Sequence, residues 1–168
     1  MSFLVPVHEL MKRPGLMREL ELEITLESPI GTEVVAIPAG DSLEVELRLE
    51  SVHEGVLATG EIFGEAKTQC SRCLEDMNLK IEVDFQELFA YSYSSDDELL
   101  VTNDHIDLEQ VVIDSVVLSL PFQPVCSKDC LGLCPECGIG LNEVPEHKHE
   151  NVVDARFEAL KDLLSKEE

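Results

Sequence analysis

The sequence predicts an α+β fold built mainly on an antiparallel β-sheet. Four stretches alternate apolar and polar residues, which is typical of strands with one buried face. These stretches are residues 20–26, 43–49, 56–69 and 79–89. Consecutive strands joined by short polar connections are usually antiparallel neighbours. We therefore expect a sheet of roughly four to six strands.

Shorter elements precede and interrupt these strands. Residues 7–13 are expected to form a short helical turn that ends at Pro14-Gly15. Residues 28–31, Ser-Pro-Ile-Gly, predict a turn. Residues 34–37 predict a short strand that ends at Pro38.

The second half of the chain contains two candidate helices. Residues 106–120 are apolar at every third or fourth position, and Asp107 is suited to cap a helix there. Their valine and isoleucine content also fits a strand, so the pattern alone leaves both structures open. Near the C-terminus, Asp154 is suited to cap a final amphipathic helix. The apolar face of that helix consists of Phe157, Leu160, Leu163 and Leu164.

Length and composition indicate one cytoplasmic domain. The chain has 168 residues, of which 44% are hydrophobic, enough for one core but too few for two full domains. No apolar run is long enough to span a membrane. The N-terminus lacks the basic start and sustained apolar run of a signal peptide. In a reducing cytoplasm, clustered cysteines are more often metal ligands than disulfides.

The cysteines predict a structural zinc site. Cys70 and Cys73 form a CxxC pair at the expected turn between residues 56–69 and 79–89. The remaining cysteines are Cys126, Cys130, Cys134 and Cys137. Structural Zn²⁺ prefers four thiolate or imidazole ligands in a tetrahedron, and a CxxC turn supplies two of them. Gly138, directly after the last cysteine, permits the positive φ that such a turn requires.

Cys134 and Cys137 belong to both ligand sets that the spacing allows. In the first set they join the CxxC pair of the expected hairpin turn in a ribbon-like site. In the second set they join Cys126 and Cys130 in a local site. One zinc ion cannot use six ligands, so at least two cysteines lie outside a mononuclear site. The spacing leaves the choice open.

Other uses of these residues receive less support. His147 and His149 are further candidate ligands, but nothing apolar surrounds them, and we expect solvated loop side chains. A dithiol oxidoreductase usually places a helix N-terminus after its first cysteine, whereas the residues after Cys73 lead directly into a strand. No Ser/His/Asp or paired-carboxylate pattern supports a catalytic site. No catalytic residue and no small-molecule substrate are therefore predicted.

Charge is unevenly distributed along the chain. Lys and Arg total 12 against 35 Asp and Glu, and the net charge of −23 disfavours direct contact with RNA phosphates. No Lys or Arg occurs between Lys80 and Lys128, so this acidic interval predicts a cationic partner. Its candidate partner-binding residues are Asp96, Asp97, Glu98, Asp104, Asp107 and Glu109. Lys12, Arg13 and Arg18 form the candidate RNA contact, with a solvated chain end as the alternative.

Several motifs occur in a distinctive order. They are CSRCL at residues 70–74, FQELF at 85–89, IDL at 106–108 and CLGLCPECG at 130–138. Together they resemble the YceD family, whose members are described as large ribosomal RNA subunit accumulation proteins. The resemblance runs over nearly the whole chain. VHELMKRPG at residues 7–15 resembles the actinobacterial-type branch of that family.

The resemblance implies a fold and a function. Residues 106–120 become a helix that covers the sheet, so residues 1–125 form the sheet-and-helix core. Residues 126–168 form a Cys-rich zinc segment and a C-terminal helix, packed as part of the same domain. The implied function is that of a non-enzymatic bacterial factor for 23S rRNA accumulation or processing and large-subunit assembly.

The acidic charge narrows the expected partner to a basic large-subunit ribosomal protein or a pre-ribosomal particle, with 23S rRNA contacted indirectly. Two alternatives remain for comparison. One is a thiol–disulfide or zinc-dependent enzyme, and the other is a zinc-binding adaptor unrelated to ribosomes.

Overall fold

The computed structural model describes residues 3–92 and 99–149, which divide between two compact units. The first unit comprises residues 1–130 and the second residues 131–168. The helix expected from Asp154 onward lies outside the described residues. No helix in the described part of the chain is long and apolar enough to cross a membrane.

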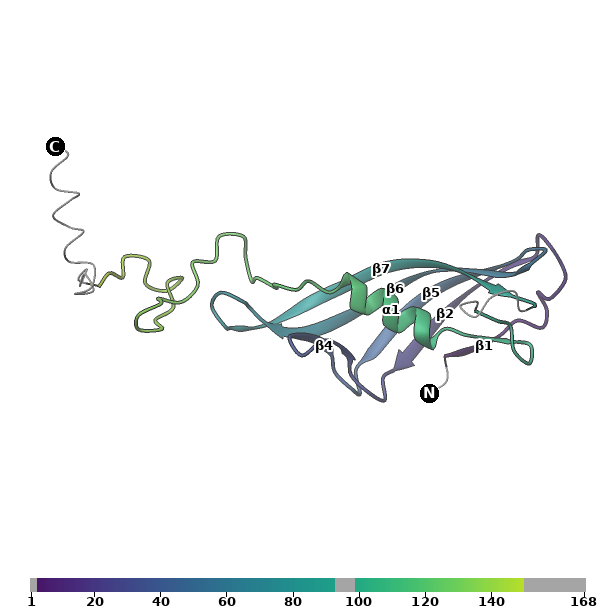
Figure 1. Cartoon of the computed structure of the whole chain (residues 1–168), viewed down its shortest axis with the longest axis horizontal. Coiled ribbons are helices and arrows are strands. Elements are labelled where there is room, and N and C mark those ends of the chain that lie inside the picture. Colours follow the sequence, from purple (N-terminus) through teal and green to yellow (C-terminus); the bar gives the residue numbers. More distant parts are fainter. Residues whose placement is uncertain (1–2, 93–98, 150–168) are drawn as a thin grey trace, which may run out of the picture. The chain divides into compact units, whose positions relative to one another are not determined.

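The first unit is built on a mainly antiparallel sheet, as the sequence predicts (Figure 1). Its strands are β2 (Met17–Thr25), β3 (Ile30–Gly31), β4 (Val35–Ile37), β5 (Ser42–Ser51), β6 (Gly55–Gln69) and β7 (Asp76–Ala90). The strand order is β2-β5-β6-β4-β3, and β7 pairs with β6. All four long strands are confirmed. Consecutive strands are not always neighbours, however, because β2 pairs with β5 and β4 pairs with β6.

The longest hairpin joins β6 and β7, strands of 15 residues each. They pair in continuous register from Gly55 opposite Ala90 to Gln69 opposite Asp76. Residues 70–75 form the connecting turn, which confirms that the first CxxC pair lies at a hairpin turn. A long two-stranded ribbon thus carries Cys70 and Cys73 to the end of the sheet.

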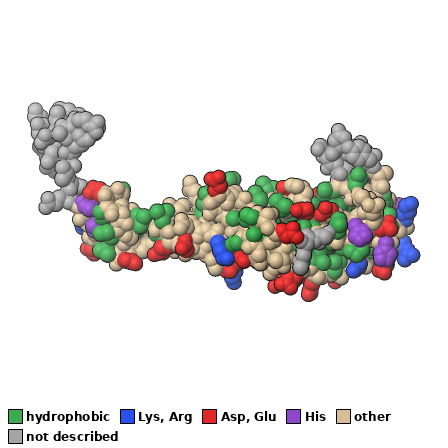
Figure 2. Space-filling model, turned by 90° about the horizontal axis from the view of Figure 1, so that it is seen from below, with side chains coloured by type: hydrophobic (Ala, Val, Ile, Leu, Met, Phe, Trp, Pro, Cys, Tyr) green, Lys and Arg blue, Asp and Glu red, His purple; other side chains and the backbone are tan. Residues whose placement is uncertain are grey.

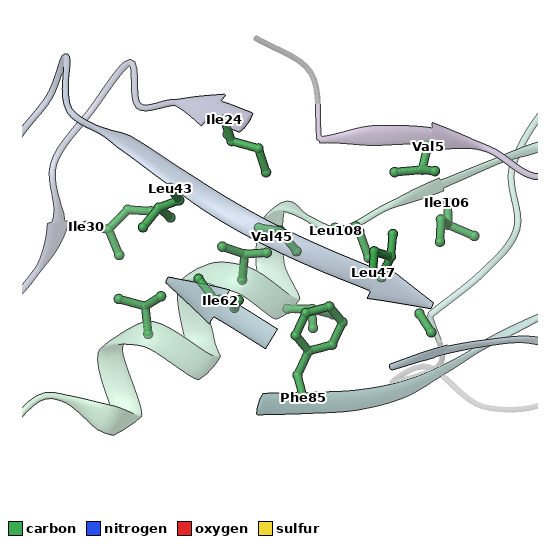
Figure 3. Packing of buried hydrophobic residues seen from close by; sticks show 14 of the residues in the cluster. Val5, Ile24, Ile30, Leu43, Val45, Leu47, Ile62, Phe85, Ile106 and Leu108 are labelled. Carbon is green, nitrogen blue, oxygen red and sulfur yellow. The ribbon is translucent and has the colours of Figure 1, made fainter. Parts of the chain in front are cut away.

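The helix α1 (Glu109–Ser119) lies across one face of the sheet (Figure 1). Figure 3 shows Val45, Ile62 and Phe85, from three neighbouring strands, close together on this face. All three are buried, and Val112 and Val116 of α1 complete the same core. Burial of these alternating apolar residues is the main force that holds the helix to the sheet.

A glycine on β6 makes room for the largest of these side chains. A Cβ atom on Gly60 would lie 2.6 Å from a ring carbon of Phe85, so only glycine lets the ring pack across the strand.

The segment 106–120 is a helix only from Glu109 onward. Before it, β8 (His105–Asp107) pairs with β1 (Leu4–Pro6) in a small antiparallel sheet that the sequence did not predict. Ile106 and Leu108 are fully buried there, which explains the apolar pattern that extends the expected helix by three residues. The Asp107 carboxylate still accepts a hydrogen bond from the Glu109 N–H, at 3.0 Å.

The helical turn expected at residues 7–13 is a single turn within a run of turns, in which the Met11 N–H donates to the Val7 carbonyl at 3.2 Å. The Leu10 N–H donates to the Val7 carbonyl, and the Arg13 N–H donates to the Leu10 carbonyl. Lys12 adopts a φ of 55°, which interrupts any continuous helix. Buried Val7 and Leu10 anchor the segment to the core.

The opposite face of the sheet is exposed and acidic. The strand register places four carboxylates directly opposite one another across β2, β5, β6 and β7. This acidic row consists of Glu21, Glu46, Glu61 and Asp84. Figure 2, which views the molecule from below rather than onto this face, also shows more Asp and Glu than Lys and Arg side chains. Like charges directly opposite one another in a sheet are destabilising, so packing does not explain this row.

Candidate metal centre

The hairpin cluster consists of Cys70, Cys73, Cys126 and Cys130, whose sulfur atoms all lie within 4.8 Å of one another. The first two come from the β6–β7 turn and the other two from the segment that follows α1. The Sγ atoms of Cys70 and Cys130 are 3.9 Å apart, and those of Cys73 and Cys126 are 3.7 Å apart. The cluster lies entirely within the first unit.

Backbone hydrogen bonds shape the hairpin turn around its two thiols. The Cys70 N–H donates to the Glu75 carbonyl, and the Leu74 N–H donates to the Cys70 carbonyl, both at 2.9 Å. Leu74 adopts a positive φ of 61°, which closes the turn. The Arg72 N–H lies 3.5 Å from the Cys70 sulfur. The turn thus folds its amide groups back toward the first sulfur, as a metal-binding CxxC turn does.

Further contacts hold the segment that carries Cys126 and Cys130 against this turn. The backbone N–H and the hydroxyl of Ser71 both donate to the Pro124 carbonyl, at 2.8 and 2.9 Å. The Arg72 guanidinium donates to the carbonyls of Lys128 and Cys130, at 3.3 and 3.0 Å. These hydrogen bonds attach Pro124, Lys128 and Cys130 to the tip of the hairpin.

The hairpin cluster is largely shielded from solvent. Cys70 is fully buried, and Cys73 and Cys130 are 7% and 5% exposed, whereas Cys126 is exposed. Met77 and Val125 pack against them and form a second apolar cluster apart from the main core. Three of the four sulfur ligands are therefore shielded from solvent.

The electrostatics of the four thiols favour a bound cation. Backbone N–H groups of Cys73 and Cys126 lower the pKa of the Cys70 thiol to about 6. The Glu75 N–H opposes the effect, yet burial and the neighbouring thiols raise the pKa of Cys73 to about 12. Hydrogen bonding with Cys130 raises the pKa of Cys126 as well. The Cys70 thiolate therefore forms readily, whereas Cys73 and Cys126 resist ionisation, and a divalent cation would stabilise their thiolate forms.

The sulfur positions fit a tetrahedral metal. With Zn–S bonds of about 2.3 Å, a tetrahedron places its sulfurs about 3.8 Å apart. The observed 3.7 and 3.9 Å agree with that spacing. A disulfide requires about 2.0 Å between the two sulfurs, so the thiols are not arranged as disulfides. The cluster is suited to hold a metal ion with four thiolates.

The C-terminal cluster consists of Cys134, Cys137, His147 and His149, whose ligand atoms also lie within 4.8 Å of one another. The Nε2 atoms of His147 and His149 lie 3.1 and 3.2 Å from the Cys137 sulfur. The two Nε2 atoms are 2.9 Å apart. All four residues belong to the second unit.

The CPECG sequence forms the turn that begins this cluster. The Gly138 N–H donates to the Cys134 carbonyl at 2.8 Å, and Gly138 adopts the positive φ of 75° expected after a CxxC pair. Backbone N–H groups of Cys137 and Glu136 lower the pKa of the Cys134 thiol to about 6. The turn therefore presents a ready thiolate, as the hairpin turn does at Cys70.

The structure groups the cysteines in neither of the two ways that the spacing suggested. Both sets paired Cys134 and Cys137 with other cysteines, whereas the structure pairs them with two histidines. His147 and His149 lie in a loop, half-buried and exposed respectively, and their Nε2 atoms face Cys137, as the alternative ligand role requires. The sequence signal that identifies them is an HxH pair ten residues after a CxxC pair. The two pairs together supply four ligands in one short segment.

The predicted partner and RNA residues occupy scattered positions. Asp104, Asp107 and Glu109 are exposed around β8 and the start of α1. Asp96, Asp97 and Glu98 lie outside the described residues. Lys12 and Arg13 are exposed in the N-terminal turns, and the Arg18 side chain donates to the Pro6 carbonyl at 3.4 Å.

The fold and site define a sheet protein with two sets of metal-ligating side chains in separate units. The family model described as "Large ribosomal RNA subunit accumulation protein YceD" matches residues 58–164. The chain therefore belongs to the YceD family. No solved structure matches it significantly.

Relatives extend the similarity to the N-terminal strands. An uncharacterized protein of Mycobacterium tuberculosis is 43% identical over 170 residues, covering 97% of this chain and 82% of the relative. An uncharacterized protein of Mycobacterium leprae is 37% identical, covering 92% of this chain and 74% of the relative. The uncharacterized protein YlbN of Bacillus subtilis is 32% identical over 112 residues, covering 64% of this chain and 65% of the relative.

Proposed function

We propose that this protein is a non-enzymatic, cytoplasmic factor in bacterial ribosome biogenesis that supports 23S rRNA accumulation and assembly of the large subunit. The single observation that carries the proposal is its membership of a family described by large ribosomal RNA subunit accumulation. That description connects the protein with the RNA of the large subunit. How the chain reaches the RNA is inferred from its charge.

The protein is proposed to act through a basic ribosomal protein rather than through direct binding of RNA. A net charge of −23 repels a phosphate backbone and attracts cationic proteins. The acidic row on the open face of the sheet concentrates this charge on a rigid surface. The acidic row is the proposed docking surface, because the paired strands hold its four carboxylates in register.

Like-charge repulsion in the acidic row supports a role in binding. Glu46 lies directly opposite both Glu21 and Glu61, and Glu61 lies opposite Asp84. Within the described residues, no ion pair neutralises any of these four side chains. Lysines and arginines of a partner would relieve this repulsion. The repulsion that destabilises the free sheet would therefore favour binding of a cationic partner.

The hairpin cluster is proposed to hold one structural Zn²⁺ ion. Its four thiolates would complete a tetrahedron and leave no open position for water or substrate. A site of this kind, with three of its four ligands buried, would tie the tip of the β6–β7 hairpin to the segment after α1. This arrangement supports a structural rather than a catalytic role for the metal.

The experiment is affinity purification of the tagged chain from its own cells, with and without neutralisation of the acidic row. The test variant combines Glu21→Gln, Glu46→Gln, Glu61→Gln and Asp84→Asn. A matched control neutralises four exposed carboxylates outside the row: Glu9→Gln, Glu33→Gln, Glu54→Gln and Glu143→Gln. Basic large-subunit proteins should copurify with the wild type and the control, but poorly with the test variant.

Two results would contradict the proposal. Normal large-subunit levels in ribosome profiles of a deletion strain would remove the role in biogenesis. Tight binding of purified protein to 23S rRNA at physiological salt, with no retention of ribosomal proteins, would remove the proposed partner while leaving the ribosomal role.

A further inference from the structure

The segment 131–149 has almost no apolar interior of its own. Leu131, Ile139 and Val144 expose 56%, 42% and 45% of their surface, and Leu133 and Leu141 are only half-buried. Among the described residues, neither hydrophobic cluster includes any residue of this segment. A chain segment without a core needs another source of stability, which in small modules is usually a disulfide or a metal.

Nevertheless, the segment is folded into a defined set of turns. The Cys134 N–H donates to the Ile139 carbonyl at 2.8 Å, and the Leu141 N–H donates to the Gly132 carbonyl at 2.9 Å. The Asn142 side chain accepts a hydrogen bond from the Leu131 N–H, also at 2.8 Å. Hydrogen bonds on an exposed surface contribute only about 1 kcal/mol each, so they do not by themselves account for the fold.

The turns bring four metal-ligating side chains to one point. The CPECG turn supplies two thiols, and a second loop supplies two imidazoles that approach the Cys137 sulfur through Nε2. The Nδ1 atom of His149 lies 3.3 Å from the Glu136 carboxylate. A carboxylate is a usual partner for the second nitrogen of a metal-ligating histidine. At Nδ1 it favours the tautomer with the proton on Nδ1, which leaves Nε2 free to bind a metal.

We propose that the C-terminal cluster is a second zinc site, with Cys134, Cys137, His147 and His149 as its four ligands. The chain then carries two zinc ions, one held by four thiolates and one by two thiolates and two imidazoles. The second ion takes the place of a hydrophobic core in the segment 131–149. This inference concerns metal content and holds whether or not the protein acts on ribosomes.

The geometry is close to that of an occupied site. Zn–S bonds of about 2.3 Å and Zn–N bonds of about 2.0 Å place S and N about 3.5 Å apart and the two N atoms about 3.3 Å apart. The corresponding distances here are 3.1 and 3.2 Å for S to N and 2.9 Å for N to N. Exposed loop side chains need to separate by only a few tenths of an ångström to admit the ion.

The donor set also selects the metal. Two thiolates and two imidazoles in a tetrahedron suit Zn²⁺, whereas hard cations such as Mg²⁺ and Ca²⁺ require oxygen ligands. The exposed carboxylate of Glu136 approaches the imidazole rather than a sulfur, so it orients a ligand instead of acting as one.

The test is the zinc content of the full-length protein, purified without chelators and measured by inductively coupled plasma mass spectrometry. Wild type should contain about two zinc ions per chain. The double variant His147→Ala/His149→Ala should retain about one, and so should Cys70→Ser/Cys73→Ser, because each removes ligands from a single site. His53→Ala/His105→Ala is the matched control, since it removes two histidines outside the cluster, and it should retain the wild-type content.

Cobalt provides a second measurement that needs no variant to fold. Apoprotein titrated with Co²⁺ should show two visible absorption spectra in succession, one typical of four sulfurs and one of two sulfurs with two nitrogens. One equivalent of zinc in the wild type would overturn the proposal. So would full zinc content in the double histidine variant, a Cys134–Cys137 disulfide in the purified chain, or a cobalt spectrum with only four-sulfur character.

Discussion

The hairpin cluster and the C-terminal cluster begin from the same motif but occupy opposite environments. Each contains a CxxC turn whose amides lower the pKa of its first thiol, at Cys70 or Cys134, to about 6. Three of the four ligands of the hairpin cluster are buried, at the end of a long hairpin, whereas only Cys134 is buried in the C-terminal cluster, in a segment of turns. The local CxxC sequence is therefore enough to lower the pKa of a thiol. The structure packed around the turn determines what a bound metal would stabilise.

In the hairpin cluster, a metal would reinforce structure that already exists. β6 and β7 pair along their whole length, and Met77 and Val125 cover the thiols. In the C-terminal cluster, a metal would replace a core. The two sites should therefore differ in how much of the protein depends on them and in how readily they lose their ion.

The largest expected effect comes from a ligand of the hairpin cluster. Cys70→Ser should lower the free energy of unfolding of the sheet unit by about 4 kcal/mol. This is the entropic free energy that a cross-link contributes when it closes a loop as long as the chain from the hairpin turn to Cys126. Thermal unfolding followed by circular dichroism in the β-sheet region measures it. Cys137→Ser is the matched control and should leave that transition in place. Equal losses for both variants would erase the distinction between the clusters.

The second expected effect is a difference in the rate of metal release. The hairpin cluster has one exposed ligand, Cys126, and three buried ones, whereas the C-terminal cluster has only one buried ligand, Cys134. A chelator reaches exposed ligands first, so zinc should leave in two phases, with the C-terminal cluster releasing its ion in the faster one. A chromogenic zinc indicator in stopped flow follows both phases. The faster phase should vanish in His147→Ala. If the faster phase persists in that variant, the zinc released in it does not come from the C-terminal cluster.

A smaller effect is expected from the carboxylate that orients His149. Glu136→Ala should weaken zinc binding to the C-terminal cluster about tenfold, because outer partners of ligating histidines contribute affinity of that order. Competition with a chelator of known affinity measures the change. Glu143→Ala removes an exposed carboxylate from the same unit without touching a ligand and should change nothing. An equal effect of both variants would indicate general electrostatics rather than orientation of the imidazole.

The smallest expected effect concerns the clamp around the hairpin cluster. Arg72→Ala removes the donor to the carbonyls of Lys128 and Cys130 and should lower the free energy of unfolding by about 1 kcal/mol, since the side chain is exposed to solvent. Chemical denaturation of the zinc-loaded protein measures this loss. Arg13→Ala is the control. No loss for Arg72→Ala would show that the thiols and their metal alone hold the two segments together.

Strict alternation made the long strands predictable. In β5, Leu43, Val45, Leu47 and Leu49 are all buried while the residues between them face outward. A sheet with one covered face imposes this period of two on the sequence, so the sequence reveals it. The same physics explains why the start of α1 was misplaced. Ile106 and Leu108 are buried through pairing of β8 with β1, a strand about a hundred residues away.

The pairing of the ligands was beyond sequence reasoning for a related reason. Spacing identifies CxxC as a metal-binding turn, and Gly138 with its φ of 75° confirms the local geometry. It does not say which other residues reach that turn. The β6–β7 hairpin delivers Cys70 to Cys130 across sixty positions of sequence, whereas the two histidines reach Cys137 from ten and twelve residues away.

By itself, the sequence determined the alternating strands, the two CxxC turns, the acidic charge and the family. Each of these depends on neighbouring residues or on overall composition. Only the tertiary structure decided that β2 pairs with β5, that four carboxylates line up across the sheet, and that six cysteines divide into sets of four and two. Those features depend on contacts between distant segments, which are set by the burial of a shared core rather than by any local pattern.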